Sequence, residues 1–206
     1  MKPVIIGRSS SHFTRIARIF AEELRVDYEF QILRDIMSPK LEDYGGNPAL
    51  KIPVLRTERG SWFGALNVCR ELARQSALTP RLVWPEDLVE PVSANAQELV
   101  LQSMATEVTL VMSRVGGGAE SGAHQDKMRR SLGNMLGWLD ENVASVFAAL
   151  PPERGVSFLE VSLYCLVLHL EFREVLSMAP YTALTEFCQR FGTRASCAAT
   201  VFRFDT

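Results

Sequence analysis

Short apolar runs and helical periodicity alternate along the first third of the chain. Residues 3–7 (PVIIG) form a compact apolar run typical of a buried strand, and three serines at positions 9–11 then supply helix-capping hydroxyls. Apolar residues recur at helical spacing from Phe13 to Leu24, and residues 28–33 (YEFQIL) alternate as in a second strand. The pattern predicts a strand, a helix and a strand.

The next segment predicts a hairpin followed by a helix. In residues 53–63 (PVLRTERGSWF), two short strands flank a turn at 58–60, and helical spacing resumes from Leu66 to Leu72. Pro53 stands directly before the third strand, although proline cannot donate a hydrogen bond to a sheet. From the residues alone, Pro53 is either an ordinary trans proline at the start of an edge strand or a cis proline that turns the backbone of Ile52 outward.

Strand patterns end near Leu78, and the rest of the chain predicts helices. The segment 79–91 has three prolines and reads as a linker, and two apolar stripes follow at 100–115 and 128–143. Ser157 and Glu160 have the spacing of a capping box before a strongly apolar helix, and a last helix is expected at 182–191. We predict an α/β domain at 1–76, a linker at 77–90 and an all-α domain at 91–206.

Composition and charge exclude several classes of partner. The 206 residues are 47% apolar, and 22 basic against 24 acidic residues give a formal charge of -2 without blocks of one sign. Nothing in this pattern favours nucleic acid or an anionic membrane. The longest apolar run, residues 161–168, is too short to span a bilayer, and the N-terminal run is too short for a signal peptide. We expect a cytoplasmic protein with a small, roughly neutral ligand or a protein partner.

The cysteines predict neither a disulfide framework nor a metal site. Cys69, Cys165, Cys188 and Cys197 form no C-x-x-C pair, and each lies in an apolar or helical context. We therefore expect buried thiols and no bound metal.

The segment NPALKIPVL at residues 47–55 resembles the NPxGKVPVL segment of glutathione transferases. The resemblance extends along the chain: IIGRSSSHFTRIARIFAEEL is similar to the first strand, loop and helix of bacterial members, and LVWPEDLVEP to the link between their domains. LGNMLGWLDENVA, SFLEVSLYCLVLHLEFR and RFGTRASCAAT resemble later segments in the same order. The resemblance implies the glutathione transferase fold, in which a thioredoxin-like N-terminal domain is joined to an all-α C-terminal domain. It also implies a cis bond before Pro53.

The resemblance also implies a catalytic residue. In the family, a hydroxyl or thiol near the first helix stabilises the thiolate of glutathione, which is the nucleophile. Aligning HFTR with the family's PYVR assigns this role to Ser11, with Ser9 and Ser10 as alternatives. Any of these serines could instead only cap the helix, and capping does not exclude catalysis.

The remaining site residues follow from the same resemblance. It implies glutathione as co-substrate, a small apolar electrophile as acceptor, and a homodimer. One departure stands at the second helix, where Gly64 and Ala65 replace the acidic residue and serine that grip the γ-glutamyl carboxylate. The expected glutathione-binding residues are Phe13, Ile52, Pro53, Gly64 and Ala65, and the expected acceptor-pocket residues are Met104, Glu107 and Val111.

Two functions remain open, and a third is disfavoured. The first is a glutathione transferase, and the second is a binding or scaffold protein that keeps the fold but has lost strong glutathione binding. A thiol–disulfide oxidoreductase is disfavoured, because residues 8–13 contain no cysteine.

Overall fold

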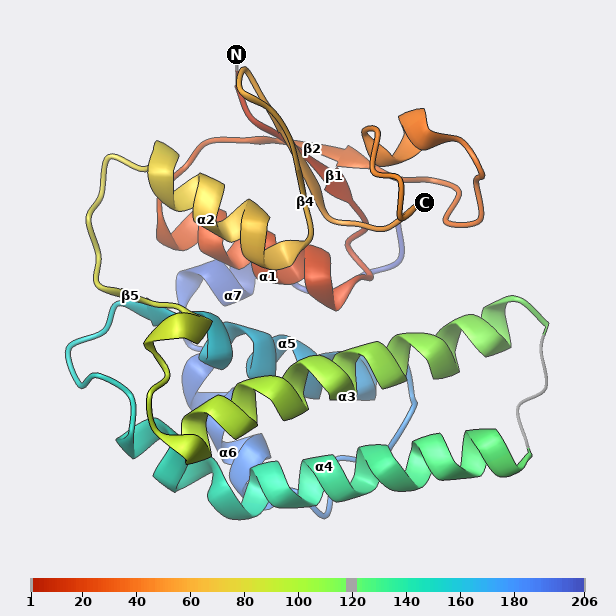
Figure 1. Cartoon of the computed structure of the whole chain (residues 1–206), viewed down its shortest axis with the longest axis vertical. Coiled ribbons are helices and arrows are strands. Elements are labelled where there is room, and N and C mark those ends of the chain that lie inside the picture. Colours follow the sequence, from red (N-terminus) through yellow and green to blue (C-terminus); the bar gives the residue numbers. More distant parts are fainter. Residues whose placement is uncertain (1, 118–121, 206) are drawn as a thin grey trace. The chain divides into compact units, whose positions relative to one another are not determined.

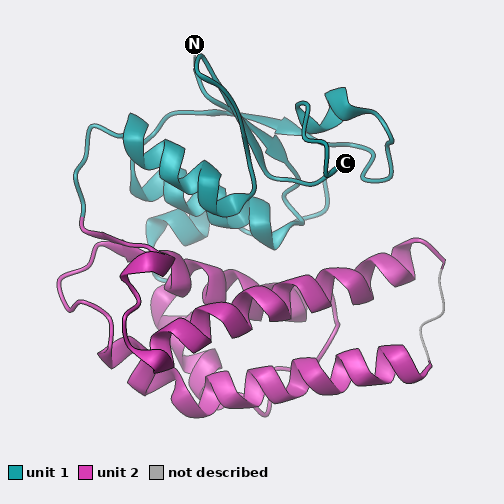
Figure 2. Ribbon diagram, in the orientation of Figure 1, with its two compact units in different colours: residues 1–80, 193–206 teal, residues 81–192 magenta. Residues whose placement is uncertain are grey.

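The computed structural model describes residues 2–117 and 122–205, which divide into two compact units. Unit 1 comprises residues 1–80 and 193–206, and unit 2 comprises residues 81–192 (Figure 2). The division falls within the predicted linker at 77–90. It differs from the predicted helical domain at the C-terminal end, because residues 193–206 pack with unit 1 rather than with the helices.

Unit 1 is built on a four-stranded mixed sheet with the strand order β2-β1-β3-β4 (Figure 1). Strands β1 (Val4–Gly7) and β2 (Glu29–Ile32) run parallel, as strands joined by a crossover helix do. Strand β3 (Val54–Thr57) pairs antiparallel with β1 and with β4 (Gly60–Phe63). The predicted strand, helix, strand and hairpin are therefore confirmed.

Two helices pack against each other beside this sheet, α1 (His12–Glu23) and α2 (Ala65–Gln75) (Figure 1). Helix α1 is buried along most of its length, including Arg15 and Arg18. These arginines donate to the carbonyls of Cys197 and Ala199, at 3.3 and 3.4 Å, in a short helix α7 (Ala195–Ala199). The sequence pattern did not predict α7, whose attachment to α1 explains why the C-terminal residues belong to unit 1.

Unit 2 is mainly helical. Helix α3 (Pro91–Val115) packs along α4 (Ala123–Ala148), α5 (Phe158–Phe172) packs on α3, and α6 (Thr182–Phe191) contacts both α4 and α5. Helix α5 is buried on nearly every side, as its apolar sequence predicts, and α6 has the predicted bounds. The expectation that strands end near Leu78 is wrong, because β5 (Leu82–Val83) pairs in parallel with β6 (Val156–Ser157).

The predicted capping box at the start of α5 is also wrong. Ser157 is the N-cap residue, but its side chain makes no capping hydrogen bond. Glu160 instead accepts two hydrogen bonds of 2.7 Å from the guanidinium of Arg154. A bidentate arginine contact is stronger than the contact of a carboxylate with a backbone N–H, so Arg154 takes the Glu160 side chain away from the cap.

Candidate active site

The turn between β1 and α1 carries the three serines. Gly7 ends β1 so close to Thr14 of α1 that a Cβ at residue 7 would lie 2.5 Å from the Thr14 hydroxyl oxygen. The chain then turns at once, and the N–H of Ser11 donates to the carbonyl of Arg8 at 3.1 Å. Glycine at position 7 therefore allows the tight passage from strand to helix that places the serines.

The three serines differ in burial and in role. Ser9 and Ser10 expose only 2% and 7% of their surface, whereas Ser11 is half-buried. Ser11 is the N-cap of α1, and its hydroxyl oxygen accepts a hydrogen bond from the N–H of Thr14 at 3.3 Å. Among the three, only Ser11 combines an accessible side chain with a position at a helix N-terminus, where the backbone favours negative charge.

The neighbouring residues of this turn are packed inward. His12 is buried, and its ring meets that of the half-buried Phe13 edge to face at 4.5 Å. Phe13 lies two positions after Ser11 in the chain, and its role in glutathione binding stays a prediction.

A loop organised by Asn47 leads to the third strand. The buried Asn47 side chain donates to the carbonyl of Lys51 at 2.7 Å and accepts from the N–H of Ala49 at 3.0 Å. Leu50 has φ +51°, a left-handed conformation that glycine adopts without steric cost. The family segment NPxGKVPVL that this loop resembles has glycine at the position of Leu50.

Ile52 and Pro53 connect this loop to the sheet. The peptide bond between them is cis, and the β3 ladder begins one residue later, at Val54. The backbone groups of the half-buried Ile52 therefore lie outside the ladder. The carbonyl of Pro53 accepts a hydrogen bond from the N–H of Gly64 at 3.2 Å, which ties the start of β3 to the start of α2.

This last contact uses a backbone donor of Gly64, one of the expected glutathione-binding residues. The N–H of Gly64 is already donated to Pro53, so it is not available to a γ-glutamyl carboxylate. Gly64 has φ +81° and ψ 148°, a conformation essentially restricted to glycine, and no side chain caps the helix. The N–H groups of the first turn of α2, beginning with the buried Ala65, remain as donors.

Asn67 adds a polar side chain at the start of α2 that is not among the residues expected from the sequence. It occupies the first turn of α2, is exposed, and donates from its side-chain amide to the carbonyl of Phe63 at 3.2 Å. It is the nearest polar side chain after the Gly64–Ala65 pair, and its position in SWFGALNV is the signal that could have found it.

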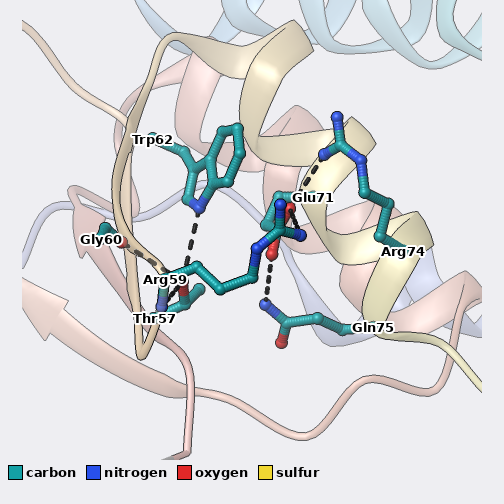
Figure 3. A network of polar contacts seen from close by, with 7 residues as sticks. All are labelled: Thr57, Arg59, Gly60, Trp62, Glu71, Arg74 and Gln75. Atoms are coloured by element: carbon teal, nitrogen blue, oxygen red, sulfur yellow. Dashed lines mark hydrogen bonds and ion pairs between the residues drawn. The ribbon is translucent and has the colours of Figure 1, made fainter.

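A buried carboxylate fastens the body of α2 to the hairpin (Figure 3). Glu71 is fully buried and accepts hydrogen bonds from Arg74 at 2.9 Å, Gln75 at 3.1 Å and Arg59 at 3.4 Å. The two guanidinium groups lie 5.2 and 5.5 Å from the centre of the Trp62 ring, within the range of cation–π attraction. Because Arg59 and Trp62 belong to the hairpin, this network holds the hairpin and α2 together.

The expected acceptor-pocket residues lie on one face of α3. Met104, Glu107 and Val111 are all buried, and the carboxylate of Glu107 lies 2.7 Å from Nδ1 of His169 on α5. Two hollows occur elsewhere: about 900 Å³ beside residues 171–189 of unit 2, and about 380 Å³ beside Glu23 and Arg194 of unit 1. None of the three residues lines either hollow, so their role in an acceptor pocket stays a prediction.

The comparisons with known proteins address the fold. Residues 10–75 match the family model of the glutathione S-transferase N-terminal domain. A glutathione S-transferase from Methylobacillus flagellatus with glutathione bound is 20% identical, with a TM-score of 0.76 over 97% of this chain and 98% of that one. The chain has the glutathione transferase fold.

Two further structures with this fold contain related ligands. A glutathione S-transferase from Methylobacterium radiotolerans, in complex with glutathione sulfonate, is 18% identical and has a TM-score of 0.77 over 100% of this chain and 97% of that one. A glutathione transferase family member from Pseudomonas fluorescens with bound glutathione is 17% identical, with a TM-score of 0.77 over 98% of this chain and 99% of that one. The resemblance read from the sequence motifs is confirmed, and bacterial proteins are among the matches.

No curated protein sequence matches the chain significantly. Among the helices in residues 2–117 and 122–205, none combines the length and apolar character that a membrane span requires.

Proposed function

We propose that this chain is a glutathione transferase that conjugates glutathione to a small apolar electrophile, with Ser11 stabilising the thiolate. The observation that carries the proposal is the half-buried Ser11 hydroxyl at the N-cap of α1, in a fold shared with structures that contain glutathione. A hydroxyl and helix N–H groups at this place favour the anionic form of a bound thiol.

The proposed reaction needs no group other than the two substrates. The glutathione thiol loses its proton to solvent, and the thiolate forms a carbon–sulfur bond at the electrophilic carbon. The leaving group departs with its bonding pair, or the adduct takes up a proton from water. Ser11 donates its hydroxyl hydrogen to the sulfur while the thiolate exists, because a hydrogen bond to the charged form lowers a pKa.

The rest of the site supports binding of the peptide. The backbone of Ile52, beside Pro53, lies outside the β3 ladder and is proposed to pair with the cysteinyl part of glutathione. The first-turn N–H groups of α2 after Gly64 are proposed to hold the γ-glutamyl carboxylate, which the helix N-terminus favours.

The chain is further proposed to act as a homodimer, and a monomer in light scattering at micromolar concentration would contradict this.

Ser11→Ala is the decisive variant. The change should lower turnover by about tenfold to a hundredfold, the effect of losing a hydrogen bond to a charged group, and should change the KM for glutathione much less. Ultraviolet absorbance of the bound thiolate should fall in parallel. Ser131→Ala, at an exposed position of α4, is the matched control. If Ser9→Ala is the damaging change instead, the assignment within the loop is wrong.

One observation favours the second function, a binding protein with the transferase fold. The start of α2 has no capping hydroxyl, and the Gly64 N–H is already used by Pro53. Passage over immobilised glutathione separates the two functions. A protein that is not retained, and that produces no thiolate absorbance with added glutathione, is the binding protein rather than the enzyme.

A further inference from the structure

The C-terminal segment of the chain returns to the serine turn. The carboxylate of Asp205 accepts a hydrogen bond from the N–H of Ser9 through Oδ2 at 2.8 Å, although the two residues are 196 positions apart. Figure 2 shows both residues' segments in unit 1. The contact therefore joins the end of the chain to the turn that carries Ser11.

The segment before Asp205 is held by α1. The guanidinium of Arg15 lies 4.4 Å from the centre of the Phe202 ring and donates to the carbonyl of Cys197 at 3.3 Å. Arg18 donates to the carbonyl of Ala199 at 3.4 Å. Helix α1 therefore contacts the chain on both sides of residue 200. These contacts anchor the segment that leads to Asp205.

The turn itself explains why Ser9 needs an outside partner. In the turn from Arg8 to Ser11, the N–H of Ser11 closes the turn by donating to Arg8. The N–H of the second residue of such a turn takes no part in this bond, and here it belongs to Ser9. A carboxylate is the strongest common acceptor for a backbone N–H, so Asp205 restrains the turn at its midpoint.

The polar surroundings of this contact fit a positional role better than a stabilising one. Within the described residues, Oδ1 of Asp205 and Oγ of Ser9 are buried without a hydrogen-bond partner, and so is Nε of the adjacent Arg8. The unpaired buried Oδ1 costs free energy, and this cost offsets part of what the bond to Ser9 contributes. Removing the carboxylate should therefore affect the turn more than the stability of the fold.

We propose that Asp205 is a positioning residue for the reaction: by holding Ser9 it sets the turn that places the Ser11 hydroxyl. The proposal rests on the proposed role of Ser11 in conjugation. It concerns turnover rather than binding, because Asp205 contacts the turn that carries Ser11, whereas the proposed binding draws on the backbone at Ile52 and α2.

The test compares Asp205→Ala with Asp205→Asn, which keeps an acceptor oxygen. Arg203→Ala, an exposed position in the same segment, is the matched control. Two measurements are made on the full chain: amide hydrogen exchange of residues 8–11 by NMR, and kcat and KM with glutathione and an aryl halide electrophile. The first measurement needs no catalytic activity.

Asp205→Ala should speed exchange of the Ser9 amide by about tenfold or more, the effect of losing a charge-assisted hydrogen bond. Its kcat should fall about tenfold with little change in KM. Asp205→Asn should restore most of the wild-type kcat and most of the protection of the Ser9 amide. Arg203→Ala should match the wild type. Unchanged exchange, unchanged kcat or a higher kcat in Asp205→Ala would overturn the proposal. If the wild type shows no turnover while exchange responds as expected, the proposed function fails and the contact with the turn stands.

Discussion

Helices α1 and α2 of unit 1 begin in opposite ways. Helix α1 begins with Ser11, whose hydroxyl caps the Thr14 N–H, and the turn before it is held by Asp205. Helix α2 has Gly64 as its N-cap residue, which has no side chain to cap the helix and donates its own N–H to Pro53. Both helix N-termini favour an anion, but only α1 adds a hydroxyl to the backbone N–H groups.

The difference bears on the two parts of the proposed site. At α1 the chain has a half-buried hydroxyl for the proposed contact with the thiolate. At α2 only backbone groups and the side chain of Asn67 remain for a carboxylate. We therefore expect weak glutathione binding together with a functional thiolate site.

The largest effect is expected where α2 is fastened. Removing both arginines by Arg59→Ala with Arg74→Ala leaves the buried Glu71 carboxylate with Gln75 as its remaining partner from this network. An uncompensated buried charge should lower the free energy of unfolding by about 3–5 kcal/mol. Denaturant titration measures the free energy of unfolding of the double variant, with Arg129→Ala and Arg130→Ala on α4 as the control pair. A loss as small as that of the control would show that the network does not hold α2.

The next effect is expected from giving α2 the missing hydroxyl. Ala65→Ser should tighten glutathione binding about tenfold or more, because a hydroxyl that donates to a carboxylate contributes about 1.5–3 kcal/mol. Titration calorimetry on both forms measures it, and Ala94→Ser, exposed on α3, is the control. Since Ala65 is only 7% exposed, the serine must point its hydroxyl toward the ligand rather than into the core. Equal affinities would mean that this helix start does not bind the carboxylate.

A smaller effect concerns the other end of α1. Glu23 accepts hydrogen bonds from Arg194 at 2.7 and 2.9 Å and from Ser196 at 2.6 Å. Burial raises the pKa of Glu23, but the hydrogen bonds and charge of these partners outweigh burial and leave the pKa below its ordinary value.

A folded-state pKa below the unfolded value means that Glu23 stabilises the protein above the unfolded pKa, near 4.5, and that this contribution is lost as the pH falls through the folded pKa. Glu23→Gln should cost about 1 kcal/mol at pH 7 and less at acidic pH. Denaturant titrations at both pH values measure the difference. A cost that is the same at both would show that the charge of Glu23 does not fasten α7 to α1.

The smallest effect is expected at a serine that resembles Ser11 only in sequence. Ser157 precedes α5 as Ser11 precedes α1, but within the described chain its hydroxyl is buried without a partner. Ser157→Ala should therefore change the free energy of unfolding by less than about 0.5 kcal/mol, whereas Ser11→Ala should cost about 1 kcal/mol. Thermal denaturation of both variants measures the contrast. A cost at Ser157 equal to that at Ser11 would show that Ser157 caps its helix after all.

Much of the fold was predictable because it follows from local patterns. The hairpin, helices α1 and α2, and the bounds of α6 follow from apolar spacing, and α5 from its continuous apolar run. Strands β5 and β6 could not be predicted, because two residues show no alternation and their pairing joins positions 82 and 156. The capping-box prediction was wrong for a related reason. Arg154 binds the Glu160 side chain, and the spacing of Ser157 and Glu160 does not show which partner Glu160 takes.

The sequence by itself determined the family of the fold and the serines that could act at the site. Only the tertiary structure showed how these serines differ in burial, because burial depends on what packs over each side chain: Ser9 and Ser10 are covered, and Ser11 is half-buried. It also showed that the Gly64 N–H is used by Pro53 and that Asp205 reaches Ser9. Hydrogen bonds between residues far apart in the chain have no periodic signal, so such contacts emerge only when the chain is folded.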